Sequence, residues 1–439
     1  MRGAKIGGEL SMSGAKCTGK LNMNPIEVTG ALLMRNGAEF SEVDLSNAKI
    51  GQLDMTGSKC TGKVLMNQIE ITGALFMRYG AWLSEVDLRA AKVGRLDMSG
   101  AKFTGKLNMN GLTVTGSLLM YPGAEFSEVD LGGAQIGEEL SMSGAKCTGK
   151  LNMNGLTVTD SLLMYPGAEF SEVDLVSARI GGGLYILGGR FTSLDLTDTS
   201  IKTVLNLGFD DLNKTIWSAD SRLLLRNTVV DAMQAPPRLD AFPNDLDLNG
   251  FKYNHLGEWR GADKGSEMAS RDSKWFTDWL GKDRTYSPQP YYQLAEVLRT
   301  MGHPEKAKDI LYAGKERELS EAIKRWEVLK WLGLSLLSYT IGYGYHYTYI
   351  VPWVIGLILL GACVYKSTSP GKASSYTKPI KWGESLAFSF DMLLPIVRLD
   401  QRHYDTSLSN GQRYYFYVHK LVGYVLGLFI IAGLSGITK

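Results

Sequence analysis

The chain has 439 residues and a formal net charge of +2, with 44% hydrophobic and 21% charged residues. Residues 1–207 hold 19 Lys and Arg against 21 Asp and Glu, a net charge of −2, which excludes a strongly acidic DNA mimic and argues against broad binding of nucleic acid through phosphate contacts. The composition changes twice: residues 1–207 are repetitive and rich in Gly, Met and Leu, residues 208 to about 330 are mixed and polar, and residues 328–439 contain long apolar runs.

A motif recurs every 43 or 44 residues through residues 1–207. The segment GGELSMSGAKCTGKLNMN begins at Gly7 and returns in part near Ser99 and again at Gly137. Within each period, triplets of an apolar, a polar and an apolar residue follow one another every five or six residues, separated by Gly-rich or polar turns. Such triplets are typical of short strands with both ends turned inward. Four of them make a coil of 21 or 22 residues, so the pattern predicts a β-solenoid with two coils per repeat.

The segment GAEFSEVDLSNAKI, residues 37–50, resembles the pentapeptide-repeat family. This resemblance implies a right-handed quadrilateral β-helix built from A-x-[LF]-x-x faces. The chain departs from the family pattern because many corners contain a sixth residue. The resemblance therefore supports the solenoid class more firmly than a square cross-section, and it implies no particular function.

Small and large residues mostly alternate at the inward positions of the second face, in the order Cys17, Phe40, Cys60, Leu83, Phe103, Phe126, Cys147, Phe170 and Phe191. Cysteines two coils apart would be separated by about 9 to 10 Å, beyond the reach of a disulfide. We therefore expect buried free thiols, and no metal site or cofactor. The outward positions mostly alternate in charge, beginning Lys16, Glu39 and Lys59, which predicts ion pairs between coils. A row of Asn and Asp on the third face, beginning at Asn22 and Asp44, is interpreted as a solvated edge.

The first face places a large apolar residue at an outward position in every second coil, and its last coil adds a tyrosine. These residues are Leu33, Phe76, Leu119, Leu163 and Tyr185. A repeated apolar stripe predicts an interface. Its occupant is a second copy of the chain, a later segment of the same chain, or a separate partner. A small-molecule or oligonucleotide ligand on the solenoid also stays open.

The regular pattern ends at Leu207. We expect irregular coils over residues 208–257 to complete a repeat domain of residues 1–257. Residues 258–327 then predict a linker and a helical hairpin, with Leu294 and Leu298 on the first helix and Pro304 opening the second. This hairpin is similar to one tetratricopeptide unit and is expected to form a rigid neck.

Residues 328–439 predict a membrane domain. Between Val328 and Tyr365 only Lys330 and His346 are charged or readily protonated, and this apolar stretch is longer than the roughly 20 residues that a spanning helix needs. We expect an interfacial helix over residues 328–339, a hinge at Gly342 and Gly344, and spans near 349–365 and 417–437. The segment TIGYG at residues 340–344 is similar to a potassium filter, but no span precedes it, so a turn with surrounding tyrosines is favoured.

Residues 382–400 form an apolar segment that is too short to cross a bilayer, so a re-entrant or a surface helix is expected. Asp391 lies within it and is the first candidate for a pore or gating residue, because ionisable groups in apolar membrane segments are usually functional. Arg398 is seven residues further on and would share a helical face with Asp391, so an ion pair at the surface is the alternative. Pro395 and His419 complete the set of pore or gating candidates.

Residues 283–439 also resemble a bacterial group that joins a β-helical repeat domain to YxPQPYxQLA, a GYGY turn and a segment like SFDMLLPIVRLD. Its members are often labelled membrane-associated oxidoreductases. The sequence has no dinucleotide-binding glycine fingerprint after a strand and no Cys-x-x-Cys motif, and its five histidines are scattered. We therefore predict no enzymatic activity and no catalytic residue.

Two apolar spans around a short segment are the layout by which oligomeric channels line a pore. The leading hypothesis is an oligomeric ion channel or pore-forming effector in the bacterial inner membrane, with the repeat domain as a cytoplasmic sensor and assembly domain. By analogy with other sensor domains fused to small membrane modules, antiviral defence is a candidate role. The alternative is a membrane-tethered binding scaffold without transport activity. The lack of an apolar leader at the N-terminus gives the expectation that the repeat domain is cytoplasmic.

Overall fold

The computed structural model describes residues 2–257, 268–367, 381–394, 399–405 and 408–434. The chain forms two compact units, Met1–Ala307 and Lys308–Lys439, and the boundary falls within helix α3 (Pro304–Lys324). The first unit contains a β-solenoid, as the sequence predicted. The second unit is helical in the residues described.

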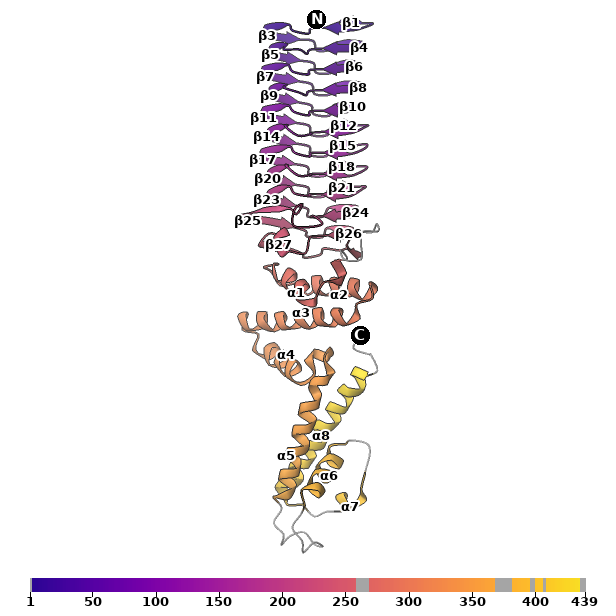
Figure 1. Cartoon of the computed structure of the whole chain (residues 1–439), viewed down its shortest axis with the longest axis vertical. Coiled ribbons are helices and arrows are strands. Elements are labelled where there is room, and N and C mark those ends of the chain that lie inside the picture. The colour runs from indigo at the N-terminus through magenta and orange to yellow at the C-terminus, as the bar shows by residue number, and fades with distance from the viewer. Residues whose placement is uncertain (1, 258–267, 368–380, 395–398, 406–407, 435–439) are drawn as a thin grey trace. The chain divides into compact units, whose positions relative to one another are not determined.

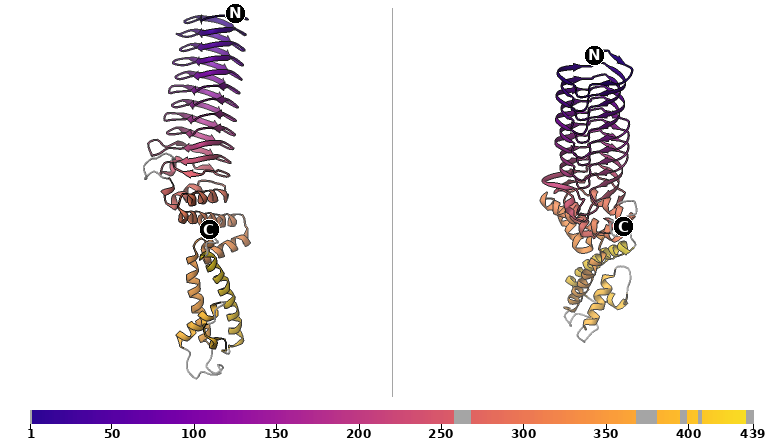
Figure 2. Two further views of the ribbon diagram at one scale, coloured as in Figure 1. Left: turned by 90° about the vertical axis from the view of Figure 1, so that its right-hand side faces the viewer. Right: turned by 45° about the horizontal axis from the view of Figure 1, so that its top comes forward.

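The solenoid consists of two long parallel sheets, whose strands stack in chain order (Figure 1). The tilted view in Figure 2 shows the coils from the N-terminal end. The 11-stranded sheet takes one strand from each coil: β3 (Lys16–Asn22), β5 (Glu39–Asp44), β7 (Lys59–Leu65), β9 (Trp82–Asp87), β11 (Lys102–Asn108), β14 (Glu125–Asp130), β17 (Lys146–Asn152), β20 (Glu169–Asp174), β23 (Arg190–Asp195), β25 (Ile216–Leu224) and β27 (Asp245–Asp247). The 17-stranded sheet contains β1 (Lys5–Ile6), β2 (Leu10–Ser11), β4 (Glu27–Leu33), β6 (Lys49–Asp54), β8 (Glu70–Phe76), β10 (Lys92–Asp97), β12 (Thr113–Val114), β13 (Leu118–Leu119), β15 (Gln135–Ile136), β16 (Leu140–Ser141), β18 (Thr157–Val158), β19 (Leu162–Leu163), β21 (Arg179–Ile180), β22 (Leu184–Tyr185), β24 (Ser200–Asn206), β26 (Val229–Gln234) and β28 (His255–Leu256).

Many strands run across two of the four predicted faces and bend between them. The solenoid therefore has two bent sheets instead of four flat faces. The pairing of β3 with β5 shifts register between Cys17 and Lys20, and most longer strand pairs shift at the equivalent place. Glycine occupies many of these bends. A Cβ at Gly51 would meet the Thr29 carbonyl oxygen of the coil before, so a side chain cannot fit there. The sixth residue seen at many corners in the sequence is accommodated by this bend.

Apolar side chains fill the interior from end to end. Eleven methionines between Met23 and Met164 are fully buried, as are most of the alternating leucines and valines. On the second face, Phe103 and Phe126 stack with ring centroids 5.2 Å apart. Cys60 and Cys147 are buried free thiols beside the aromatic rings, as predicted.

Opposite charges pair between successive coils along the solenoid surface. The Lys16 ammonium lies 3.4 Å from the Glu39 carboxylate, and Lys102 lies 2.8 Å from Glu125. A second ladder, not anticipated from the sequence, lies beyond the bend and includes Lys106 with Glu128 at 2.7 Å. These pairs are exposed, so each contributes at most about 1 kcal/mol to the free energy of unfolding.

The row of Asn and Asp has a structural role at the corners. In each case a side-chain oxygen accepts a hydrogen bond from the backbone N–H two residues on, which fixes a turn. This pattern occurs at Asn22, Asp44, Asp54, Asp87, Asp97, Asn108, Asp130, Asn152, Asp174, Asp195, Asn206 and Asp247. The earlier interpretation as a merely solvated edge is incomplete, because these groups form the corners.

The expected apolar stripe is covered by its own neighbours. Leu33, Leu119 and Leu163 are only 7%, 4% and 9% exposed, so the expectation that they project into solvent is wrong. The strand turns into a corner directly after each of them. At Phe76 a corner side chain folds back over this face: the guanidinium of Arg78 lies 4.1 Å from the centre of the Phe76 ring. Tyr185 is half-buried beside Tyr165, with ring centroids 6.4 Å apart.

Two helices, α1 (Ser273–Gly281) and α2 (Gln289–Thr300), close the last coils of the solenoid. The Gln289 side chain accepts a hydrogen bond from the Gly250 N–H at 2.9 Å and donates one to the Phe251 carbonyl at 3.1 Å. Gln293 donates to the Tyr253 carbonyl at 2.7 Å. The two amides thus substitute for the backbone of a further coil, which a solenoid end requires.

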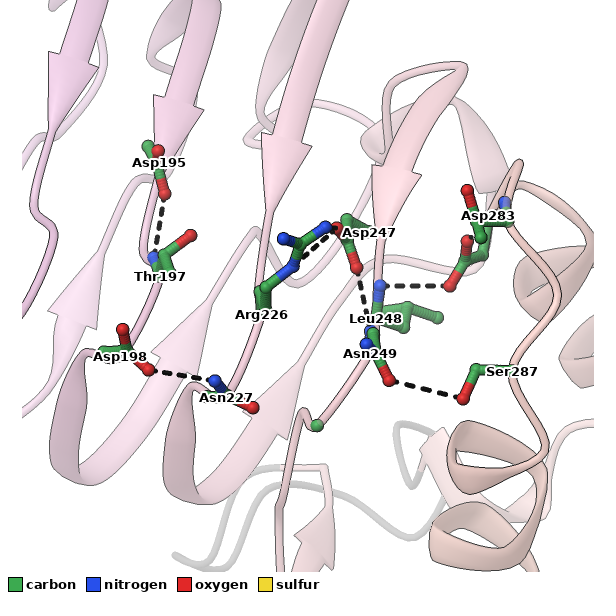
Figure 3. Close-up of polar contacts among 12 residues, drawn as sticks. Asp195, Thr197, Asp198, Arg226, Asn227, Asp247, Leu248, Asn249, Asp283 and Ser287 are labelled. Atoms are coloured by element: carbon green, nitrogen blue, oxygen red, sulfur yellow. Dashed lines mark hydrogen bonds and ion pairs between the residues drawn. The ribbon is translucent and has the colours of Figure 1, made fainter.

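Asp283, between the two helices, accepts a hydrogen bond from the Leu248 N–H at 3.1 Å (Figure 3). The same view shows Ser287 bonded to Asn249 and the corner bonds of the preceding coils. The sequence analysis grouped residues 258–327 as a neck. The structure places α1 and α2 in the same compact unit as the solenoid, and α3 begins at Pro304, after the turn at Gly302.

We predict that replacing both Gln289 and Gln293 with alanine opens the last coils. The Gly250 N–H and two carbonyl groups would lose their partners, at about 1–3 kcal/mol for each unsatisfied group. Hydrogen exchange of residues 245–256 should accelerate strongly. Gln135→Ala, at an exposed position of β15, is the matched control and should change nothing. Unchanged exchange in the double variant would show that the two amides do not cap the solenoid.

Candidate functional site

The second unit is organised around two apolar helices, α5 (Ile350–Lys366) and α8 (Asn410–Leu434). They lie antiparallel, because Ile350 at the start of α5 packs near Leu426, whereas Val364 near its end packs against the cluster of Phe416. The Gln412 side chain also donates a hydrogen bond to the Val364 carbonyl at 2.9 Å. Both helices agree closely in position with the expected spans, and Figure 1 shows them side by side.

Only α8, among the described residues, is long and apolar enough to cross a bilayer by itself. Its segment Asn410–Ile431 has a mean hydropathy of 1.4, yet only 22% of it is buried by the rest of the protein. Helix α5 has 17 residues and would be about 25 Å long at 1.5 Å per residue, short of the roughly 30 Å of a hydrocarbon core. Among the described residues, α8 is thus a candidate membrane span by its length and composition, and the two-span arrangement stays a prediction.

A third helix, α6 (Trp382–Leu393), packs against the end of α5 and the start of α8. Its Phe388 ring stacks on Tyr365 with centroids 4.0 Å apart and meets Phe416 edge-on at 5.1 Å. Asp391, near the end of α6, is fully buried. The segment thus forms the predicted short helix, which ends at Leu393, and it buries the predicted ionisable group.

Asp391 holds the following chain segment in place. Its carboxylate accepts hydrogen bonds from the backbone N–H groups of Leu399, at 2.9 Å, and Asp400, at 3.3 Å. The third partner is the Nδ1 atom of His403, 2.8 Å from the carboxylate, on the short helix α7 (Gln401–Tyr404). The imidazole Nδ1–H donates in this contact, because a carboxylate can only accept.

The environment of Asp391 favours its charged form. Burial by itself disfavours that form, but the two N–H groups and His403 outweigh it, so the pKa of the carboxyl lies below its ordinary value. A buried carboxylate with three donors is a stable structural anchor, and its charge becomes available only if the segment moves away.

The other predicted gating residues are distributed as follows. Arg398 and Pro395 lie outside the described residues. The predicted pairing of Asp391 with Arg398 therefore stays a prediction. Among the described residues, α6 ends at Leu393 and Leu394 is extended, as is usual before proline. His419 on α8 is buried, 2% exposed, with Nε2 3.2 Å from the Ser389 carbonyl.

His419 links α6 to α8 through both ring nitrogens. Nε2–H donates to the Ser389 carbonyl, and the Tyr415 hydroxyl, 3.3 Å from Nδ1, donates to the remaining nitrogen. This arrangement selects the neutral imidazole with its proton on Nε2. His419 thus joins α8 to α6, and Asp391 joins α6 to α7.

The glycines of the predicted hinge form a fixed turn. Helix α4 (Val328–Ile341) ends at Gly342, and a single turn, η3 (Gly342–Gly344), follows. Gly342, Tyr343 and Gly344 all have left-handed backbone angles, with φ of 52°, 55° and 86°. A Cβ on Gly342 would lie 2.9 Å from the His346 Cβ. A second short turn, η4 (Tyr347–Tyr349), leads into α5.

Sequence reasoning missed His403 as the partner of Asp391. The two residues lie twelve positions apart across a segment that contains a proline, so no helical spacing connects them.

The stripe residues lie in the solenoid, in the other compact unit, and take no part in this cluster. Within the described ranges, no three His, Cys, Asp or Glu side chains are grouped so that they could hold a metal ion. Comparison with protein-family models, curated proteins and solved structures gives no match to this chain.

We predict that Asp391→Asn loosens the segment that follows α6 and lowers the thermal midpoint of the helical unit at neutral pH. The loss should be about 1.5–3 kcal/mol, the range for hydrogen bonds to a charged group. Because the folded pKa is depressed, the contribution of Asp391 is present above the unfolded pKa of about 3.9 and is lost as the pH falls through the folded value. The gap between the wild type and the variant should therefore shrink as the pH falls below about 3.9. Asp405→Asn, at an exposed position, is the control; a gap that does not depend on pH would contradict this assignment.

We also predict that Gly423→Ala separates α8 from α6. A Cβ at Gly423 would collide with the Leu393 carbonyl oxygen, which is backbone and cannot turn aside. Overpacking of this kind costs about 1–3 kcal/mol, and the thermal midpoint in detergent should fall accordingly. Gly356→Ala in α5 has open space and should leave it unchanged. Equal midpoints for the two variants would disprove the close approach.

Proposed function

We propose that this chain is a membrane protein and that several copies assemble into an ion channel or pore. The observation that supports membrane insertion most directly is that the apolar helix α8 leaves most of its surface uncovered by the rest of the protein. The core helix of a water-soluble protein would be buried instead. Large apolar side chains on α5 are exposed as well, among them Trp353, Ile355 and Leu359. Lipid or neighbouring copies are the natural cover for these surfaces.

In this proposal the pore lies beside the short helix α6, and the Asp391 carboxylate provides the ionisable group. Within one chain, Asp391 is buried and bonded to His403. This arrangement corresponds to a closed state. Opening would separate the segment after α6 from Asp391 and expose the carboxylate to permeating cations.

The solenoid acts, in the same proposal, as the cytoplasmic sensor and assembly domain of a protein of the bacterial inner membrane. A role in antiviral defence through membrane depolarisation is part of this proposal. The charge ladders leave the solenoid surface close to neutral, which suits a protein, small-molecule or short oligonucleotide ligand better than broad binding of nucleic acid. We propose no catalytic role and no cofactor.

The second candidate function is a membrane-tethered scaffold without transport activity. One observation favours it: Asp391, the intended pore residue, is fully buried and has partners on its own chain. An anchor of this kind would use α5 and α8 only to hold the solenoid at the membrane, where the solenoid recruits a partner.

Vesicle flux measurements distinguish the two candidates. We expect purified full-length protein in phospholipid vesicles to dissipate an imposed potassium gradient, as reported by a voltage-sensitive dye, and Asp391→Asn to change the rate or ion preference. Asp405→Asn, which alters an exposed carboxylate of the same unit, should behave as the wild type. Because the closed state is stable, the assay includes an acid arm that weakens the Asp391 contacts. Vesicles no leakier than protein-free ones in both arms would eliminate the channel and retain the scaffold.

A further inference from the structure

The turn between α3 and α4, residues 322–331, has an unusual residue at its centre; we call this segment the elbow. Helix α3 ends with the Glu327 N–H bonded to the Ala322 carbonyl at 2.9 Å and the Trp326 N–H bonded to the Ile323 carbonyl at 3.1 Å. These two bonds define a Schellman motif in which Trp326 takes the left-handed position, with φ of 58°. Glycine is strongly favoured at this position, because a Cβ there is strained.

The strained tryptophan contributes little to the interior of the protein. Its side chain is 86% exposed, although tryptophan is among the residues most often covered. A residue held in an unfavourable backbone conformation, with its side chain directed away from the protein, indicates an interaction with something else.

An apolar cleft of about 320 Å³ lies at the elbow. Its lining residues are Ala322, Ile323, Trp326, Val328 and Trp331. Each of them has an apolar side chain, apart from the indole N–H groups of the two tryptophans. The cleft therefore suits a hydrocarbon chain and offers few partners to a polar ligand.

Helix α4 continues this apolar surface along its outer face. Leu329, Leu332 and Leu336 are 85%, 51% and 65% exposed. The polar contacts lie on the side toward α3, where the Ser338 hydroxyl donates to Glu316 at 2.7 Å and the Lys330 ammonium lies 3.0 Å from Glu318. A helix at a water-facing surface shows the reverse distribution, whereas a helix lying at a bilayer surface shows this one.

The position of the elbow identifies its occupant. Helix α4 is followed within eight residues by α5, one of the two helices that we assign to the bilayer, so the outer face of α4 continues into that apolar surface. Arg325 immediately precedes Trp326 and is exposed, whereas the exposed Lys324 ammonium lies 2.6 Å from the Glu321 carboxylate. A basic side chain beside an apolar surface suits the phosphate of a lipid headgroup. We propose that the elbow binds a phospholipid of the bilayer, with an acyl chain in the cleft and the headgroup phosphate beside Arg325, and that Trp326 is retained for this contact.

This inference rests on the proposed insertion of α5 and α8. The elbow would fix the depth at which the preceding part of the chain emerges from the membrane. The proposal predicts that lipid covers the apolar face of α4. Binding of a protein partner to that face would contradict the proposal.

The test uses a substitution with opposite effects on stability and on binding. Trp326→Gly places the favoured residue at the left-handed position, so the thermal midpoint of the full chain should stay the same or rise. The same change removes one wall of the cleft, so binding of dioleoylphosphatidylglycerol to the chain in detergent, followed by native mass spectrometry, should weaken about tenfold or more. Arg325→Gln should lower the preference for phosphatidylglycerol over phosphatidylcholine. Glycerol phosphate, which has a headgroup but no acyl chain, should not bind.

Tyr79→Gly is the matched control, because Tyr79 is a second exposed aromatic residue with a left-handed backbone, 65% exposed with φ of 45°, and lies in the solenoid. It should leave lipid binding unchanged. Wild-type lipid affinity in Trp326→Gly would overturn the proposal, as would a marked loss of stability, which would assign Trp326 a structural role. Retention of the wild-type chain on vesicles after an alkaline wash is measured separately. A chain that washes off refutes the membrane proposal itself, whereas a chain that stays while Trp326→Gly binds lipid normally refutes only the elbow site.

Discussion

The backbone hydrogen bonds between successive coils are the interaction on which the first unit depends. The strands of each coil pair their N–H and C=O groups with the coil before and the coil after, because strands of two to nine residues cannot pair within a coil. Three features follow from this requirement. Glycine is needed where coils approach most closely at the bends, Asn and Asp side chains fix the corners, and the last coil needs donors and acceptors from outside the repeat. The amides of Gln289 and Gln293 provide those groups.

The second unit is governed by a different constraint, because its apolar surface exceeds what the unit can bury. Helices α5 and α8 cover each other only in part, and α4 carries its apolar residues outward. Inside the unit, two buried polar side chains make defined contacts: Asp391 holds the segment after α6, and His419 links α6 to α8. An exposed apolar exterior, over an interior in which the charged Asp391 is buried and bonded, suits a hydrocarbon environment and is the physical basis of the proposed membrane function.

Much of the fold could be predicted from the sequence, because it depends on periodicity and composition. The 43-residue repeat, the inward Cys and Phe positions, the ion pairs between coils and the positions of α4, α5, α6 and α8 all follow from patterns of apolar and charged residues. Exposure was harder to predict. Leu33, Leu119 and Leu163 occupy outward positions in the strand pattern but are buried in the structure, because the pattern does not specify how neighbouring side chains cover a face.

The candidate site could be predicted only in part. Asp391 was identifiable as a charge within an apolar segment, whereas His403 was not, because the contact depends on how the chain turns after α6. The strain at Trp326 was also invisible, since a left-handed tryptophan leaves no signal in the sequence.

The buried thiols leave the protein suitable for labelling at an introduced cysteine. Burial raises the pKa of the Cys147 thiol to about 11 and also raises that of Cys60, so both should be unreactive near neutral pH.

The central claim is that the uncovered face of α8 lies in lipid. The most direct test attaches a nitroxide to Leu421→Cys, a position 64% exposed on α8, in a chain whose Cys17 and Cys363 are replaced by serine. In phospholipid vesicles, collision rates with oxygen, which concentrates in bilayers, are compared with those of a water-soluble nickel complex, and a label at Tyr79→Cys on the solenoid serves as the reference for water. The account predicts high oxygen and low nickel accessibility at position 421. Nickel accessibility equal to that at position 79 would contradict it.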